Sequence, residues 1–95
     1  MKITLHTILG IKNAIGQRLT EIDLPQGSTI EDFLAYMKKR WGKALASNMF
    51  DPDSGALLPY VRIMVNGQTI HFLKGMSTPL KEGDEVLILP LASGG

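Results

Sequence analysis

The residues that could do chemistry stand at the end of the chain, where Ser93-Gly94-Gly95 follows the apolar segment from Glu85 to Leu91. Glycine has no Cβ, so a diglycine can be straightened and threaded into a channel too narrow for any side chain. The reactive group of such a tail is the carboxylate of Gly95. The pattern therefore predicts a protein whose working group is its own C-terminus. Two plainer explanations are a frayed chain end and a linker remnant of the Ser-Gly-Gly type.

The composition bounds what else the chain can do. Its 95 residues are enough for one small domain with a single core, and 44% apolar residues exclude a disordered chain. The absence of cysteine excludes disulfides, a thiol nucleophile and a thiolate metal site, and two histidines are too few for a zinc site without carboxylate help. A net charge of +1 and the lack of a long apolar segment or secretory leader indicate neither nucleic acid nor membrane as a partner. We expect a cytoplasmic protein without a metal.

The first half of the chain predicts a hairpin and a helix. Residues 2–9 and 18–24 alternate apolar and polar side chains, and residues 10–16 are predicted to be the loop between them. Ser28-Thr29-Ile30-Glu31 has the spacing of a capping box, with Ser28 as the cap and Glu31 as its partner. Apolar residues then recur at helical spacing and predict a long amphipathic helix that ends near Gly42.

Basic residues close this predicted helix. Lys38, Lys39 and Arg40 lie in its expected last turn, where cations suit the negative end of the helix dipole. The same residues could form a docking patch for an acidic partner, and the sequence leaves both explanations open. Residues 43–50 have room for one further helical turn.

The second half predicts three strands. Residues 60–65 alternate, Asn66-Gly67 is a strong hairpin-turn signal, and residues 68–72 and 85–90 follow as strands. The order is therefore ββαβββ. Three acidic residues beside the last strand, Glu82, Asp84 and Glu85, are expected to form a solvated turn.

The chain resembles the ubiquitin-like β-grasp sulfur carriers, most of all the small subunit of molybdopterin synthase, and is related to the thiamine-biosynthesis carrier. The resemblance implies an α+β fold in which one main helix packs on a mixed sheet of about five strands. It divides the chain into a domain over residues 1–91 and a tail over residues 92–95. The motifs that carry it, besides the diglycine end, are Val65-Asn66-Gly67, Thr78-Pro79-Leu80 and Gly83-Asp84-Glu85-Val86.

The resemblance also implies the chemistry. An adenylyltransferase related to ubiquitin-activating enzymes joins the Gly95 carboxylate to AMP, using ATP and magnesium, and a persulfide donor then leads to a thiocarboxylate that delivers sulfur. A large synthase subunit is a further implied partner. The chain itself shows no nucleophile–base pair, so we expect a protein co-substrate rather than an enzyme. Two alternatives stay open, namely a modifier conjugated to other proteins through Gly95, and an interaction module whose tail is inert.

A partner protein needs a surface to bind on this domain. On the last strand Val86 and Ile88 are expected to face the core, which leaves Leu87 and Leu89 on the other face. By resemblance, Leu89 belongs to an apolar patch that binds activating enzymes. The alternative is that these side chains pack beneath residues 43–58 as core. The partner-binding candidates, besides Ser93 and Gly94 of the tail, are Leu89, Leu87, Leu91, Met64, Ile70 and His6.

Overall fold

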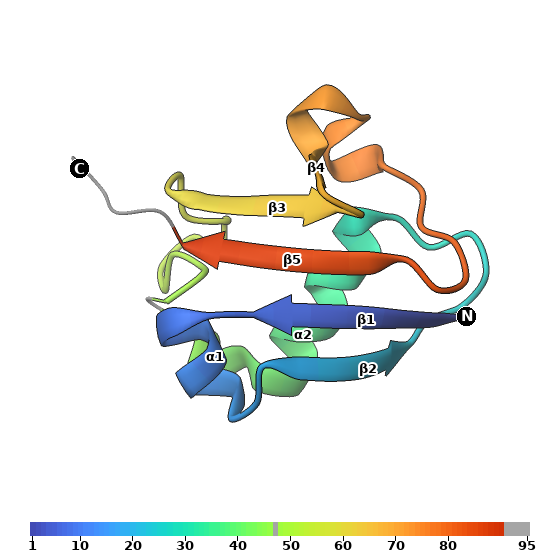
Figure 1. The fold of residues 1–95 in the computed structure, drawn as a ribbon. Coiled ribbons are helices and arrows are strands. Elements are labelled where there is room, and N and C mark those ends of the chain that lie inside the picture. Colours follow the sequence, from blue (N-terminus) through green and yellow to red (C-terminus); the bar gives the residue numbers. More distant parts are fainter. Residues whose placement is uncertain (47, 91–95) are drawn as a thin grey trace.

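The computed structural model describes residues 1–46 and 48–90, and in this part of the chain five strands form one mixed sheet (Figure 1). The strand order is β2-β1-β5-β3-β4, so the last strand along the chain lies in the middle. The predicted α+β architecture, with one main helix on a mixed sheet, is confirmed. The elements are β1 (Lys2–Thr7), α1 (Leu9–Ile15), β2 (Leu19–Asp23), α2 (Ile30–Leu45), β3 (Val61–Val65), β4 (Gln68–Thr69), the 3₁₀ turns η1 (Ile70–Phe72) and η2 (Gly75–Ser77), and β5 (Glu85–Pro90).

The central strand β5 is hydrogen-bonded along both edges. It runs parallel to β1 and antiparallel to β3. Parallel neighbours cannot be joined by a tight turn and need a long crossover, which here includes α2. Because both edges of β5 are paired, the strand that leads to the C-terminus is a rigid base.

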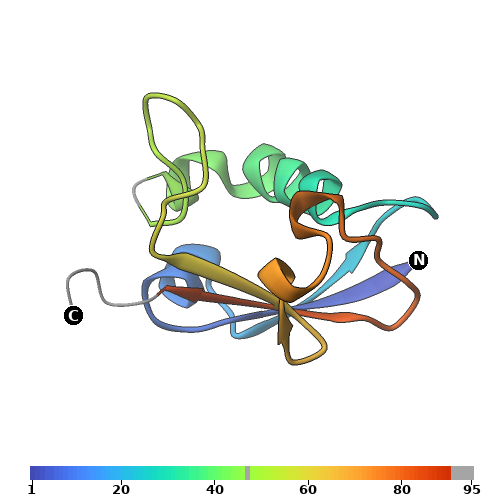
Figure 2. The same cartoon turned by 90° about the horizontal axis from the view of Figure 1, so that it is seen from above.

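Helix α2 covers one face of the sheet, and among the described residues the opposite face has no helix over it (Figure 2). The helix runs to Leu45, beyond the predicted end near Gly42, and Trp41 departs from helical geometry with φ −125° and ψ 22°. The core lies between α2 and the covered face. Its fully buried members include Ile3, Leu5, Phe33, Met37, Val86 and Ile88.

The N-cap of α2 lies one residue later than the sequence predicted. Thr29 is the cap, because its hydroxyl accepts a hydrogen bond from the backbone of Asp32 at 3.4 Å and the Asp32 carboxylate accepts one from the backbone of Thr29 at 2.9 Å. The Ser28 hydroxyl instead donates to the carbonyl of Pro25 at 2.7 Å. The predicted box of Ser28 with Glu31 is therefore wrong, since Ser28 already holds the preceding turn together.

Residues 9–15 form helix α1, where the sequence predicted a strand as far as Leu9 and a loop over residues 10–16. Gly16 ends this helix with φ +96°, and its N–H donates to the carbonyl of Lys12 at 2.8 Å. A left-handed residue at this position favours glycine. Ile11 is fully buried and anchors the short helix to the core.

The predicted strand over residues 68–72 is wrong beyond Thr69. Asn66 and Gly67 have φ values of +49° and +86°, as a tight hairpin turn with two left-handed residues requires. The hairpin has only two cross-strand pairs before the chain curls into η1. Ile70, at 7% exposure, turns inward and joins the core.

Asp84 ties the turn between β3 and β4 to the start of β5. It is only 6% exposed, and its carboxylate accepts hydrogen bonds from the Asn66 amide at 2.9 Å and from the Lys81 backbone at 2.8 Å. The side-chain oxygen of Asn66, Oδ1, in turn accepts a hydrogen bond from the backbone N–H of Glu85 at 2.9 Å. The expectation of a solvated acidic turn is therefore wrong for Asp84, whose carboxylate is part of the fold.

Replacing Asp84 with alanine is expected to lower the free energy of unfolding by about 2 kcal/mol, because two donors lose their acceptor in a buried position. Urea denaturation would measure this loss. Glu82→Ala is the matched control, since Glu82 accepts only an exposed bond from the backbone of Lys2 at 3.1 Å. Its loss should stay within about 0.5 kcal/mol. A D84A protein with the wild-type urea midpoint would contradict the assignment.

Candidate functional site

The predicted reactive tail begins where β5 ends. Pro90 is the last residue of β5. The tail candidates Ser93, Gly94 and Gly95, and the candidate contact Leu91, lie outside the described residues. The roles given to them, and the boundary between residues 91 and 92, therefore stay predictions. What the structure adds is the base from which the tail starts, the central strand of the sheet.

The two faces of β5 divide as the alternation predicts. Val86 and Ile88 are fully buried against α2, whereas Leu87 and Leu89 are half-buried on the open face of the sheet. Residues 48–58, green to yellow in Figure 2, lie on the α2 side. They contribute Met49 and Phe50 to the core. Leu87 and Leu89 therefore do not pack beneath this segment.

Strand register places three of the predicted contact residues side by side. Leu87 pairs with His6 on β1 and with Met64 on β3, and His6 pairs in turn with Leu19 on β2. We call Leu19, His6, Leu87 and Met64 the open-face row. It crosses four strands, and Leu19 is 50% exposed while the other three are half-buried. Neighbouring side chains in such a row are close enough to act as one surface.

Leu19 is the member of the row that sequence reasoning missed. Leu19, Ile22 and Leu24 are the apolar residues of the predicted strand over residues 18–24. Side chains in a strand alternate with period two, so residues three apart lie on opposite faces. The parity of Leu19 and Ile22 was the signal that could have placed Leu19 outside.

Ile70 does not belong to this surface. The sequence placed it on the predicted strand over residues 68–72 and among the partner-binding candidates, but β4 ends at Thr69 and Ile70 is buried in the core. Thr69 occupies the place opposite Met64 instead. The apolar part of the open face is therefore narrower on the β4 side than the sequence suggested.

Charged side chains border the row. Arg62 pairs with Leu89 across β3 and β5, and Glu85 lies two residues before Leu87 on the same face. The Glu85 carboxylate is 3.8 Å from Nδ1 of His6, whose side chain is 30% exposed. An apolar centre with a polar rim is the usual anatomy of a protein–protein interface.

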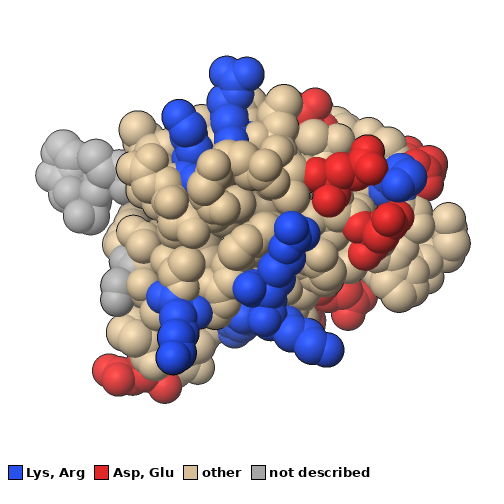
Figure 3. All heavy atoms as spheres, turned by 90° about the horizontal axis from the view of Figure 1, so that it is seen from below, with Lys and Arg blue, Asp and Glu red and all other residues tan. Residues whose placement is uncertain are grey.

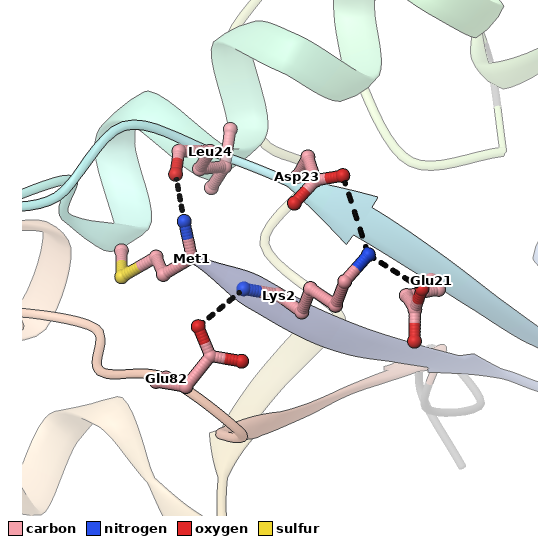
Figure 4. A network of polar contacts seen from close by, with 6 residues as sticks. All are labelled: Met1, Lys2, Glu21, Asp23, Leu24 and Glu82. Carbon is pink, nitrogen blue, oxygen red and sulfur yellow. Dashed lines mark hydrogen bonds and ion pairs between the residues drawn. The ribbon is translucent and has the colours of Figure 1, made fainter.

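A separate ionic cluster lies where β1 begins. Nζ of Lys2 is 3.2 Å from the Glu21 carboxylate and 3.6 Å from that of Asp23, while the N-terminal ammonium donates to the carbonyl of Leu24 (Figure 4). The hydrogen bond to Glu21, together with the charges of Asp23 and Glu21, raises the pKa of Lys2 above 10.5. The stabilisation of the fold by the interactions of charged Lys2 is fully present below pH 10.5 and is lost as the pH rises through the folded-state pKa of Lys2.

Charge is unevenly distributed over the surface. Figure 3 shows one face of the molecule. Most of its acidic side chains gather on the right, at the end where β1 begins, and most Lys and Arg side chains lie over its middle and left. On α2, Nζ of Lys38 lies 4.8 Å from the ring centroid of Phe50, and the Arg40 guanidinium lies 4.4 Å from that of Trp41. Helical geometry breaks at Trp41, so Lys38 and Arg40 lie in the last turn of the segment of α2 that ends there. The dipole explanation therefore keeps its basis for these residues, and the docking explanation stays a prediction.

The described residues offer no metal site. Within residues 1–46 and 48–90 no group of three His, Asp or Glu lies close enough to hold an ion. A pocket of about 520 Å³ lies beside the turn between β3 and β4. Its lining includes Lys74, Lys81 and Asp84. Pro90 pairs with Val61, at the other end of β3, so this pocket is remote from Pro90. No helix in the described part of the chain combines the length and apolar character needed to span a membrane.

This arrangement, a mixed sheet with one long helix on one face and a central last strand, is the α+β β-grasp fold of ubiquitin-like proteins. The family model described as the ThiS family matches residues 11–95. The chain therefore belongs to the ThiS family. This confirms the resemblance to ubiquitin-like sulfur carriers that the sequence motifs carried.

Known relatives carry related names. A putative sulfur carrier protein of Archaeoglobus fulgidus is 33% identical over 82 residues, which cover 86% of this chain and 90% of the relative. Small archaeal modifier protein 1 of Methanosarcina acetivorans is 26% identical, with a TM-score of 0.83 over 99% of this chain and 96% of that one. A putative molybdopterin converting factor subunit 1 of Pyrococcus furiosus is 26% identical, with a TM-score of 0.73 over 97% of this chain and 99% of its own. The first two names describe a sulfur carrier and a modifier, and the third describes a subunit of a molybdopterin converting factor.

Proposed function

We propose that this protein is a sulfur carrier whose Gly95 carboxylate becomes a thiocarboxylate. An activating enzyme transfers AMP from ATP, held with magnesium, to the carboxylate and releases pyrophosphate. A persulfide sulfur then displaces AMP, and a thiol cleaves the resulting acyl disulfide to leave the thiocarboxylate, a nucleophile near neutral pH. The carrier supplies the tail and the docking surface, and its partners supply ATP, magnesium and catalysis.

One observation carries the proposal most directly. The chain of a ThiS-family protein continues from the central, doubly paired strand β5 into a terminal Gly94-Gly95. A tail that starts from a rigid strand can be positioned by the way in which the folded domain docks. Positioning of this kind is what an enclosed partner site needs to bring the carboxylate to ATP and to exclude water.

Two observations bear on the finer role. The similarity to a molybdopterin converting factor subunit favours delivery of sulfur to a molybdopterin precursor, with a large synthase subunit as the receiving partner. The similarity to a small archaeal modifier protein favours a second role, in which Gly95 is joined to amino groups of other proteins. Both roles share the adenylation step. A thiamine-type or other sulfur acceptor remains the alternative to the pterin precursor.

Intact-mass spectrometry tests the proposal. The full chain is incubated with the activating enzyme of its own genome, ATP, magnesium and a persulfide donor. A gain of about 16 Da, one oxygen replaced by sulfur, is expected on the fragment that contains Gly95. Omission of ATP is the control and should abolish the gain. Formation of adenylate without sulfur transfer, followed by attachment to proteins, would favour the modifier role, and the absence of both products would overturn the two together.

A further inference from the structure

Leu9 has two features that a leucine side chain does not favour. Its side chain is 64% exposed, and its backbone is left-handed with φ +56°. That conformation costs free energy for any residue with a Cβ, whereas glycine adopts it freely and asparagine tolerates it. Neither burial nor backbone preference therefore accounts for a leucine at this position. Strained residues of this kind concentrate where the side chain has a function.

The surrounding packing holds Leu9 in place. Ile11, two residues later, is fully buried and fixes the start of α1 to the core. A Cβ built on Gly10 would lie 3.3 Å from the side-chain oxygen of Asn48, so this turn lies tightly against the neighbouring segment. The side chain of Leu9 is thus presented to solvent between two buried residues, Thr7 and Ile11.

Leu9 lies at the end of the sheet from which the tail starts. Thr7, the last residue of β1, pairs with Ile88 of β5, and Leu9 and Pro90 each follow two residues later. Helix α1 packs against β5 and lies at the same end of the sheet as the end of β5 (Figure 1).

The length of the chain beyond Pro90 limits where a partner can dock. Gly95 is the fifth residue after Pro90. At a maximum of about 3.6 Å per residue, the terminal carboxylate stays within about 18 Å of Pro90. A protein that encloses Gly95 must therefore come against this end of the sheet, where Leu9 projects.

We propose that Leu9 is a contact residue for the activating enzyme, and that its side chain enters an apolar depression on that enzyme beside the channel that takes the tail. The contact rests on the proposed carrier function and extends the docking surface beyond the sheet face to the start of α1. This contact would explain why a leucine occupies a position with a left-handed backbone. The fold gives up some stability, and the partner gains an apolar anchor that is already in position.

The test uses variants that separate the backbone from the side chain. Leu9→Gly relieves the left-handed backbone and removes the anchor, whereas Leu9→Ala removes the anchor and keeps the strain. In ATP–pyrophosphate exchange with the activating enzyme, both are expected to raise the KM for the carrier by at least about tenfold, with kcat little changed. L9G should melt at the wild-type temperature or a few degrees higher, and L9A should not gain.

Phe72→Ala is the matched control. Phe72 is 85% exposed and follows β4, beyond the end of β3 that lies away from Pro90. Its KM should equal the wild-type value. If wild-type protein supports exchange and L9G has an unchanged KM, the contact is wrong and the carrier function stands. If wild-type protein supports no exchange, both fail.

Two further results would overturn the contact. A melting temperature that falls by several degrees in both L9G and L9A would assign Leu9 to packing within the fold. Sedimentation that shows a wild-type dimer and an L9G monomer would assign it to self-association.

Discussion

Deletion of Gly95 is expected to reduce thiocarboxylate formation by more than about 10²-fold while leaving the melting temperature unchanged. The shortened tail still ends in a glycine carboxylate, but its reach from Pro90 falls by about 3.5 Å. Displacing a reacting group by about 1 Å can already cost about 10²-fold in rate. Stability should not change, because the last core residue along the described chain is Ile88.

Single-turnover formation of the product that is about 16 Da heavier, read by intact-mass spectrometry, measures the effect. Two matched variants separate the causes. Ser93→Ala keeps both the length and the glycine pair and should react as wild type does. Deletion of Ser93 keeps Gly94-Gly95 but loses the same reach, so it should fall with the Gly95 deletion. A Gly95 deletion that reacts at the wild-type rate would mean that the reach of the tail does not limit the reaction and that Gly94 can replace Gly95 as the acceptor of sulfur.

The strands could be predicted from the sequence because each has one buried and one open face. Val86 and Ile88 alternate with Leu87 and Leu89, and this period of two survives whatever the partner strands are. The Asn66-Gly67 turn was equally predictable from the sequence, because few residue pairs tolerate two left-handed positions. Local chemistry alone determined these features.

Helix α1 and the end of β4 could not be predicted in the same way. Over its seven residues α1 buries only Ile11 completely, so there is too little periodicity to distinguish a helix from a loop. Its C-terminal signal, Gly16, is equally typical of a turn. Ile70 was misplaced because its inward direction depends on how soon the hairpin ends, which tertiary packing decides.

The cap of α2 shows how overlapping signals compete. Ser28 and Thr29 both precede an acidic residue three positions later, so the sequence offers two capping boxes. The structure uses Thr29, because the hydroxyl of Ser28 is taken by Pro25 and the backbone of Ile30 donates to the carbonyl of Thr78 at 3.0 Å. One deciding contact is three residues away, and the other lies far along the chain.

The candidate site likewise has some residues that the sequence could place and one that only the folded structure shows. His6, Leu87 and Met64 meet on the open face because register brings them together, and the parity of each strand already indicated that face. Leu9 could not be found from the sequence, since its left-handed backbone and its exposure appear only in the folded chain. What these side chains contact depends on a second molecule, which the sequence of this chain does not encode.

Replacing Leu89 with glutamate is expected to lower kcat/KM for adenylation by at least about 30-fold, the effect of losing a central interface contact. The side chain is half-buried on the open face, so a partner that covers this face would have to desolvate an added carboxylate. Stability should change little, because Leu89 pairs across the sheet with Arg62, and opposite charges at directly paired positions attract. The melting temperature, read by circular dichroism, should stay within a few degrees of wild type.

Phe72→Glu adds the same charge at an exposed apolar residue that lies away from the open-face row, and it should retain wild-type kcat/KM. The comparison therefore separates a local contact from a change in net charge. Equal losses in both variants would indicate long-range electrostatic repulsion by the enzyme, which rising salt concentration would relieve. Wild-type kinetics in L89E would mean that the activating enzyme does not grip the open face and that recognition depends on the tail and the end of the sheet alone.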